Sequence, residues 1–204
     1  MANNDYPMGP AVKQRLRAEL LSARAAVSDA VHAAEARALC SHLPAVVGGA
    51  ATVAAYVPIG SEPGSAELLD ALLQLCSRVL LPVARTSAGG TPLPLRWGEY
   101  RKGELASAPF GLLEPREPWL PATELASAAV LLVPALSVDR HGVRLGRGAG
   151  FYDRSLGFRT PAAALVAVVR DDELVDALPV EPHDVPMTHA LTPNTGLVAL
   201  SDAP

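Results

Sequence analysis

The sequence predicts an α/β fold, a three-layer α/β/α sandwich around a mostly parallel central sheet. Two observations support this prediction. Segments with helical patterns alternate along the chain with short apolar runs. Within those runs apolar and polar residues do not alternate, which is typical of strands buried on both faces of a parallel sheet. The length of 204 residues and the lack of a long linker predict a single domain, residues 1–204, with residues 1–10 as a disordered tail.

Four helices are expected. Leu16 and Leu20 form an apolar stripe along the first of them. Ser28 and Ser65 are suitable N-caps for the second and third helices, and Pro44 is expected to follow the end of the second. The expected ranges are 11–26, 28–43, 65–77 and a helix that opens within 150–156.

Six strands are expected, at 52–57, 78–83, 93–97, 129–133, 163–169 and 197–200, and those at 52–57, 129–133 and 163–169 are expected to be buried. Residues 136–144 are predicted to be extended with a turn at His141 and Gly142, and residues 98–127 to be rich in loops. In open parallel sheets, ligands bind at the carboxyl ends of the strands. Polar residues that directly follow a strand are therefore the candidates for a functional site.

Composition and charge exclude several classes of protein. The 17 basic and 21 acidic residues give a net charge of −4 that is spread along the chain, which argues against a general nucleic-acid binder. Cys40 and Cys76 are the only cysteines, so neither a disulfide scaffold nor a zinc cluster is expected. The amino terminus is polar, and no apolar run is long enough to span a bilayer. We therefore expect a cytoplasmic monomer without nucleic-acid or membrane partners.

Residues 144–153 form the most informative segment. Glycine occurs at every second position, which leaves the backbone free to adopt positive φ and to approach a ligand. Consecutive N–H groups, a helix that begins there and two arginines would attract an anion such as phosphate. Phe151 stands where a dinucleotide-binding fingerprint has its third glycine, and no Gly-Lys-Ser/Thr sequence follows as in a Walker A loop. The alternative is a turn in which the glycines serve the backbone geometry alone.

Lys13 and Arg17 lie four residues apart, on one face of the first expected helix together with Arg24. The ordinary interpretation is a solvated face. However, only two of the 17 basic residues are lysines, and a lysine ammonium is well suited to a phosphate. Asp153, at the start of the expected fourth helix, either complements the helix dipole or binds Mg²⁺ beside phosphates.

Other polar and aromatic positions admit two interpretations each. Glu62 follows the first expected strand and is either a ligand-binding carboxylate or a solvated loop residue. Asp184 is either a second metal ligand or a turn residue, and His183 beside it is expected to be structural. Phe110 belongs to the core or forms a flat wall for a ring, whereas Trp97 is expected in the core.

Together these residues resemble the 5-formyltetrahydrofolate cyclo-ligase family. The matching motifs follow the order found in the family and cover residues 12–200. The glycine loop is the most specific of them, and the pair of cations near the amino terminus is the weakest. The motifs are Lys13-x-x-x-Arg17, Glu62 after a strand, Phe110-Gly111-x-x-Glu114-Pro115, Val133-Pro134-Ala135, Asp139-x-x-Gly142 leading into residues 144–153, and Glu181-x-His183-Asp184.

The resemblance implies a fold of the kind found in sugar-phosphate isomerases. It also implies an enzyme that cyclises 5-formyltetrahydrofolate to 5,10-methenyltetrahydrofolate, with ATP as co-substrate, Mg²⁺ as cofactor, and ADP and phosphate as products. In that case the catalytic residues are Lys13, Arg147 and Tyr152, and Asp153 and Asp184 hold the metal. The residues that bind ATP are Lys13, Arg17, Arg144, Leu145, Gly146, Arg147, Gly148, Ala149, Gly150, Phe151 and Tyr152, and those that bind the reduced folate are Val57, Glu62, Phe110, Gly148 and Tyr152.

Three positions depart from common family patterns. Thr188 replaces a second carboxylate and is left out of the metal site, Ala149 replaces lysine or glycine, and Phe151 replaces tyrosine. The sequence contains no nucleophile motif, in keeping with phosphoryl transfer, which relies on charge stabilisation and positioning. Two alternatives are a sensor that binds a sugar phosphate or nucleotide through the glycine loop without catalysis, and a phosphosugar isomerase that acts without ATP.

Overall fold

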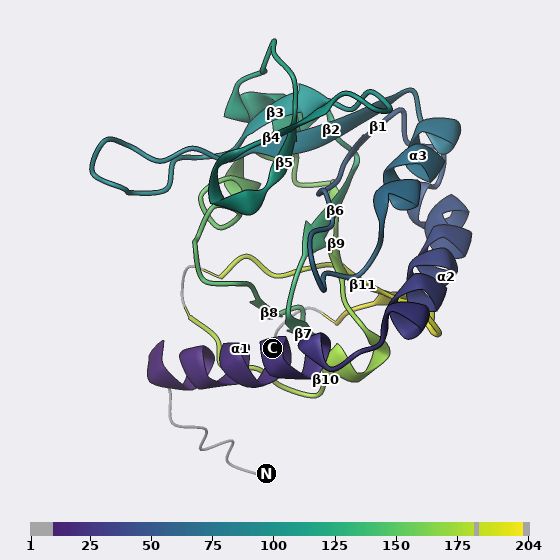
Figure 1. Ribbon diagram of the computed structural model, residues 1–204, viewed down its shortest axis with the longest axis vertical. Helices are drawn as coiled ribbons and strands as arrows, with labels where there is room; N and C mark the ends of the chain where they lie inside the picture. Colours follow the sequence, from purple (N-terminus) through teal and green to yellow (C-terminus); the bar gives the residue numbers. More distant parts are fainter. Residues whose placement is uncertain (1–9, 182–183, 202–204) are drawn as a thin grey trace.

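The structure is a computed structural model that describes residues 10–181 and 184–201 (Figure 1). The expected disordered tail lies outside this range except for Pro10, which begins the first helix, and His183 also lies outside it. A seven-stranded sheet forms the centre, in the order β12-β11-β9-β6-β1-β2-β3. The strands are β1 Thr52–Ala54, β2 Arg78–Val83, β3 Arg96–Glu99, β6 Val130–Pro134, β9 Ala164–Val168, β11 His189–Thr192 and β12 Gly196–Ala199.

The central sheet is mostly parallel, as predicted. The five inner strands run parallel to one another, and only the edge strands β3 and β12 pair antiparallel. The strands alternate their side chains between two separate apolar cores. In β2, for example, Val79 and Leu81 face one core and Leu80 faces the other. Both faces of the sheet are therefore buried, which explains why its strands are uniformly apolar.

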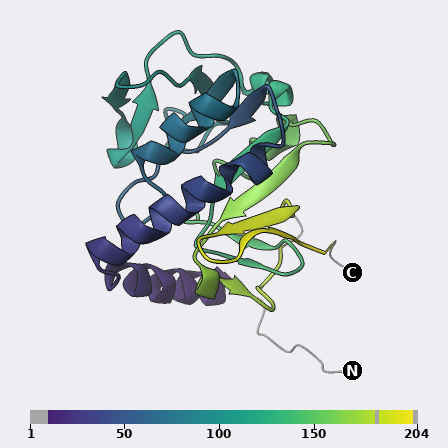
Figure 2. The same ribbon diagram turned by 90° about the vertical axis from the view of Figure 1, so that its right-hand side faces the viewer.

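Helices α2 Asp29–Val47 and α3 Ala66–Leu75 cover one face of the sheet (Figure 2). Ser28 caps α2 by accepting a hydrogen bond from the backbone N–H of Val31. The helix continues for one turn beyond the expected end at Leu43, because Pro44 removes only one N–H while the following valines are buried in the core. Gly48, in the left-handed region at φ 56°, ends it.

Short 3₁₀ helices and loops cover the opposite face, including Ala122–Ser127 and Leu156–Phe158. The helix expected to open within 150–156 does not form. Gly148 and Gly150 both have positive φ, and turns follow up to the 3₁₀ helix. The Ser155 hydroxyl donates to the carbonyl of Phe151 and accepts from the N–H of Leu95, which ties the turns to another segment. The glycine loop therefore has no helix dipole behind it, and the prediction that a helix N-terminus contributes to anion binding is wrong.

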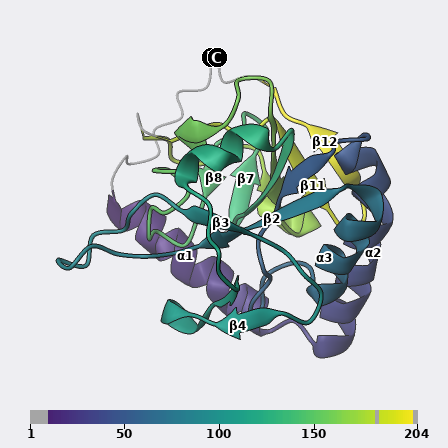
Figure 3. The ribbon, with the colours of Figure 1, turned by 90° about the horizontal axis from the view of Figure 1, so that it is seen from above.

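Helix α1 Pro10–Ala25 lies across the carboxyl ends of the central strands (Figures 1 and 2). A small sheet of β7 Ser137–Asp139, β8 Arg144–Leu145 and β10 Leu174–Val175 adjoins it, and includes the turn expected within residues 136–144. The loop between β2 and β3 extends away from the sheet (Figure 3). Strands β4 Leu105–Ser107 and β5 Leu113–Pro115 form a hairpin in the region expected to be loops. In the described part of the chain, no helix is long and apolar enough to cross a membrane.

Candidate active site

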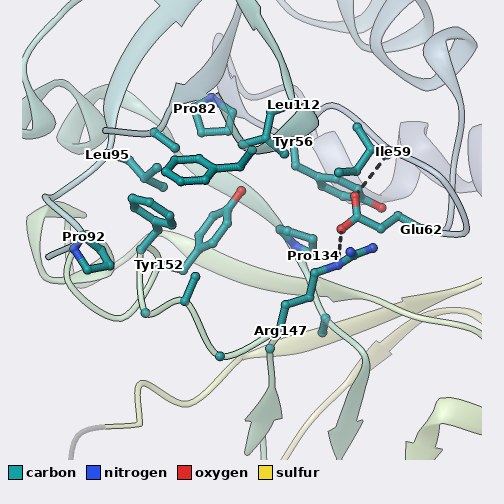
Figure 4. A pocket seen from close by; sticks show the side chains of 18 of the residues that line it. Tyr56, Ile59, Glu62, Pro82, Pro92, Leu95, Leu112, Pro134, Arg147 and Tyr152 are labelled. Carbon is teal, nitrogen blue, oxygen red and sulfur yellow. Dashed lines mark hydrogen bonds and ion pairs between the residues drawn. The ribbon is translucent and has the colours of Figure 1, made fainter. Parts of the chain in front are cut away.

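A cavity of about 420 Å³ opens at the carboxyl ends of the central strands, where the sequence predicts ligands. This volume suits a small molecule or cofactor. Residues from six parts of the chain line it: α1, the loop after β1, the end of β2 with the β2–β3 loop, the turn of the β4–β5 hairpin, the end of β6 with the residues that follow it, and the glycine loop (Figure 4). Most of the lining is apolar. Glu62 and Arg147 lie at one end of the cavity, called here the charged end, opposite Pro92 and Leu95 (Figure 4).

The glycine loop is held against α1 by Arg17. The Arg17 Nε donates to the carbonyl oxygen of Gly146 at 2.9 Å. Gly148 has φ 93°, and a Cβ at this position would lie 3.2 Å from Cζ of Arg17. Only glycine allows both this backbone conformation and this approach. Leu145 is buried in β8, whereas Ala149 is exposed at the tip of the loop.

Glu62 and Arg147 form an ion pair at the charged end of the cavity. Arg147 Nε lies 3.0 Å from Glu62 Oε1, and the N–H of Ile59 donates to Glu62 Oε2 at 3.1 Å (Figure 4). The carboxylate is only 7% exposed. Burial raises the pKa of Glu62, and the charge of Arg147 and the Ile59 N–H oppose this rise only in part.

Arg144 pairs with Asp153 across the base of the same loop, with 2.5 Å between Nη2 and Oδ1. The Arg144 guanidinium also lies 5.8 Å from the centre of the Tyr152 ring. Figure 4 shows the Tyr152 side chain directed into the cavity. Its hydroxyl is buried and has no hydrogen-bond partner within the described part of the chain. Burial, reinforced by the charge of Glu62, raises the pKa of Tyr152, so this hydroxyl keeps its proton and can donate it in a hydrogen bond to a ligand.

Lys13 lies on α1 outside the lining of the cavity and pairs with two carboxylates. Its Nζ donates to Glu181 at 2.7 Å and to Asp184 at 2.9 Å. Burial alone would lower the pKa of Lys13, but the hydrogen bonds to Asp184 and Glu181 outweigh it and the pKa is raised. Asp184 also accepts from the backbone N–H of Glu181. The structure thus joins Lys13 to Asp184, the residue expected to bind a metal.

The predicted metal ligands do not form a preassembled cluster. No group of three or more His, Cys, Asp or Glu side chains that could hold a metal occurs in residues 10–181 and 184–201. Asp153 lines the cavity, whereas Asp184 does not. Mg²⁺ commonly takes one or two carboxylates and completes its shell with water and substrate phosphates. Asp153 therefore fits a magnesium ion that a nucleotide brings with it.

The aromatic and apolar candidates also line the cavity. Val57 and Phe110 both line it. Phe110 is 60% exposed, and its ring centre lies 5.9 Å from that of Phe151 in the glycine loop. Phe110 is therefore a wall of the cavity rather than a core residue, while Trp97 is buried in the core as predicted.

Arg24 and Tyr56 are two of the cavity residues that were missed in the sequence. Arg24 of α1 lines it and is buried, and Tyr56 lines it with its hydroxyl donating to the carbonyl of Pro63. Arg24 had a signal, because it lies on the same helix face as Lys13 and Arg17. Tyr56 had none, since it stands at the end of an apolar run and looks like any strand residue.

Comparison with known sequences gives consistent matches. Residues 10–193 match the model of the 5-formyltetrahydrofolate cyclo-ligase family. A protein of Mycolicibacterium smegmatis named 5-formyltetrahydrofolate cyclo-ligase is 59% identical over 193 residues, which are 95% of this chain and 100% of that protein. A protein of Escherichia coli with the same name is 32% identical over 144 residues, 70% of this chain and 78% of that protein.

Solved structures share the fold. A 5,10-methenyltetrahydrofolate synthetase of Aquifex aeolicus, determined by NMR, has a TM-score of 0.74 at 23% identity and covers 95% of each chain. A 5,10-methenyltetrahydrofolate synthetase of Mycoplasma pneumoniae has a TM-score of 0.65 at 20% identity, over 86% of this chain and 94% of that one. The predicted fold class and enzyme family are confirmed: this chain belongs to the 5-formyltetrahydrofolate cyclo-ligase family.

Proposed function

We propose that this protein converts 5-formyltetrahydrofolate to 5,10-methenyltetrahydrofolate in an ATP- and Mg²⁺-dependent reaction that releases ADP and phosphate. One observation carries the proposal. A single cavity joins an apolar, aromatic end to a loop that offers arginines and backbone N–H groups. A planar pterin suits the first end and a triphosphate the second, so both substrates can react in one place.

The folate would lie between the aromatic wall of the cavity and Glu62. Phe110 and Tyr152 offer ring faces to the pterin, and Val57 adds apolar surface. The Glu62 carboxylate would accept hydrogen bonds from N–H groups of the pterin. For this to happen Arg147 must share or leave Glu62, because the two side chains pair in the structure.

The phosphates of ATP would lie on the glycine loop, from Arg144 to Tyr152. Arg147 is more exposed than its partner Glu62, so its guanidinium can turn toward a phosphate with little loss of packing. Arg17 fixes the position of the loop through Gly146. Lys13 lies on the same face of α1 and would add a point charge near the phosphates.

Mg²⁺ would be held by Asp153, with Asp184 as the second candidate, and would neutralise charge on the transferred phosphoryl group. The chain itself supplies positioning and charge. The formyl oxygen, pushed by the N5 lone pair, attacks the γ-phosphorus and ADP leaves. N10 then attacks the activated carbon and the ring closes, the N10 proton passes to the phosphate, and phosphate departs. Arg147 and Lys13 stabilise charge on the phosphoryl oxygens, and the Tyr152 hydroxyl donates a hydrogen bond without losing its proton.

All reactants in these steps are small molecules. We further propose that the protein works in the cytoplasm as a monomer, without nucleic-acid or membrane partners. The test is a spectrophotometric assay of 5-formyltetrahydrofolate with and without ATP and Mg²⁺. We expect turnover only when both are present. Binding without turnover would favour a sensor instead, and activity on a phosphosugar without ATP would favour an isomerase.

Arg147→Ala tests the phosphate end of the proposal. Loss of one donor to a developing charge lowers kcat by about 100-fold. Arg140→Ala is the control, because Arg140 lies on the surface and pairs with the exposed Asp176. Equal kinetic constants for the two variants would remove Arg147 from the proposed machinery.

A further inference from the structure

Glu114 belongs to the motif at residues 110–115, yet the proposed function assigns it no role. It lies in β5, at the base of the β4–β5 hairpin, and is 7% exposed. Both of its carboxylate oxygens are taken by Arg85, which follows β2. Nη1 donates to Oε2 at 2.7 Å and Nη2 donates to Oε1 at 2.7 Å. This paired arrangement fixes the angle between the two groups as well as their distance.

The base of the hairpin is tightly fixed on the sheet. The guanidinium of Arg85 lies 4.3 Å from the centre of the Trp119 ring, and Nη1 also donates to the carbonyl of Ala84. The indole N–H of Trp119 donates to the carbonyl of Pro115 at 2.9 Å. Pro115 lies directly on Gly98 of β3, where a Cβ would come within 2.4 Å of its ring. Arg85 is therefore the centre of the contacts that orient the hairpin.

The tip of the hairpin, residues 109–113, reaches the cavity instead. Phe110 and Leu112 line the cavity, and Phe110 meets Phe151 of the glycine loop. Phe110 has φ 64°, a conformation that a bulky side chain rarely adopts. The hairpin thus connects a fixed base on the sheet to an aromatic wall at the apolar end of the cavity.

We propose that the Arg85–Glu114 ion pair positions Phe110 for the folate, so that both residues are positioning residues of the reaction. This inference rests on the proposed function. Gly111, Leu112 and Leu113 separate Glu114 from Phe110. Four residue steps reach at most about 13 Å, so a tilt of about 10° at the base moves the tip by up to about 2 Å. Displacements of this size in a positioning group reduce catalysis strongly.

The inference predicts an asymmetry between the two substrates. The hairpin contributes to the apolar end of the cavity, whereas the phosphate end is built from α1 and the glycine loop. Loss of the ion pair should therefore weaken the binding of folate and leave that of ATP nearly unchanged. A merely structural role for Glu114 would reduce both alike.

Glu114→Gln keeps the shape of the side chain and removes its charge. We expect the KM for 5-formyltetrahydrofolate to rise about tenfold and the KM for ATP to change less than about twofold. Glu99→Gln is the matched control, because it removes an ion pair with Arg78 at the far end of β2. Both of its KM values should equal those of the wild type.

A double-mutant cycle tests whether Glu114 acts through Phe110. In a Phe110→Ala background, Glu114→Gln should have no further effect on the KM for folate, since the side chain that it positions is gone. Additive effects would overturn the inference. If Glu114→Gln fails to fold, Arg85→Lys replaces it, because lysine keeps the charge but lacks the paired donors.

Arg85→Lys should raise the KM for folate alone, and an unchanged value would overturn the inference. Suppose that the wild-type protein turns over the folate and that Glu114→Gln has the same kinetic constants as Glu99→Gln. This pair of results refutes the inference and leaves the proposed function intact. A wild-type protein without ATP-dependent turnover refutes both.

Discussion

The ion pair between Arg24 and Glu173 anchors α1 to the rest of the protein. Arg24 Nε lies 2.6 Å from Glu173 Oε1, and Nη2 lies 2.7 Å from Oε2. The same Nη2 donates to the carbonyl of Ala135, directly after β6. The side chains are 1% and 4% exposed. Since α1 also holds Lys13 and Arg17, this pair links the stability of the fold to the site.

Arg24→Met removes the charge and keeps an unbranched apolar chain. The Glu173 carboxylate then stays buried with the N–H of Arg170 as its remaining hydrogen-bond donor in the described part of the chain. Removal of one partner of a buried ion pair costs about 3–5 kcal/mol. Two charge-assisted hydrogen bonds at about 1.5–3 kcal/mol each give a similar range, about 3–6 kcal/mol. We expect the free energy of unfolding to fall by about 4 kcal/mol, which lowers the Tm of a protein of this size by about 8–16 °C.

Urea unfolding followed by circular dichroism measures this loss. The double variant Arg24→Met, Glu173→Leu leaves no unpaired charge and should recover at least half of it. Arg15→Met is the control, because Arg15 and Glu19 form a pair at the surface of the same helix. The reasoning fails if Arg24→Met loses less than about 1 kcal/mol, or if the double variant is as unstable as the sum of the single ones.

Three further predictions concern pH and the glycine loop. Burial raises the pKa of Glu62, and the charge of Arg147 opposes this rise. Arg147→Ala should therefore raise the pKa of Glu62 further and move the acid limb of the pH profile of kcat/KM for folate to higher pH. An acid limb at the same pH as in the wild type would show that Arg147 does not influence the titration of Glu62. Burial would raise the pKa of Asp171, but hydrogen bonds outweigh it and the pKa is lowered from 3.8. Its stabilisation is therefore complete above this value and is lost as the pH falls through the lower pKa of the folded state. Asp171→Ala should lower the free energy of unfolding, measured with urea, by about 2 kcal/mol at neutral pH and by less in acid. A difference from the wild type that does not change with pH would contradict this. Gly148→Ala should lower the free energy of unfolding by at least about 1 kcal/mol and weaken ATP binding measured by calorimetry, because the new Cβ strains the backbone and displaces Arg17. In Gly157→Ala, the control, the new Cβ meets open space, so this variant should bind ATP normally.

Much of the fold follows from local sequence patterns. The expected strand at 78–83 coincides with β2, because a run of apolar residues there is buried on both faces. Strand β11 was missed, since His189 and Thr192 leave only two apolar residues between them. Its place in the sheet depends on pairing with β9 and β12 rather than on its own composition. Such tertiary pairing is not visible in a short window of sequence.

In the site, too, some residues follow from local sequence patterns and others depend on tertiary contacts. The glycine loop, Glu62 and Phe110 were located from the sequence, and the structure brings them together around one cavity. Their partners were not predictable, because residues far apart in the chain meet only after folding. Arg24 and Glu173, for instance, are separated by 149 residues. The expected helix after the loop does not form, and there too a distant contact was not predictable: Ser155 accepts a hydrogen bond from the N–H of Leu95, 60 residues away in the sequence.

The ion pairs of the site share one feature that bears on the proposed reaction. Three of the cations that would bind phosphate are each paired with a carboxylate that would bind the metal or the folate: Lys13 with Asp184, Arg144 with Asp153, and Arg147 with Glu62. These pairs keep the charges of a partly buried site balanced. In the proposed reaction, binding of ATP would be an exchange, in which a cation that turns to a phosphate releases a carboxylate for Mg²⁺ or for a pterin N–H group. Because the free energy of each exchange depends on both new partners, nucleotide, metal and folate would favour one another's binding, and the coupling would act in both directions.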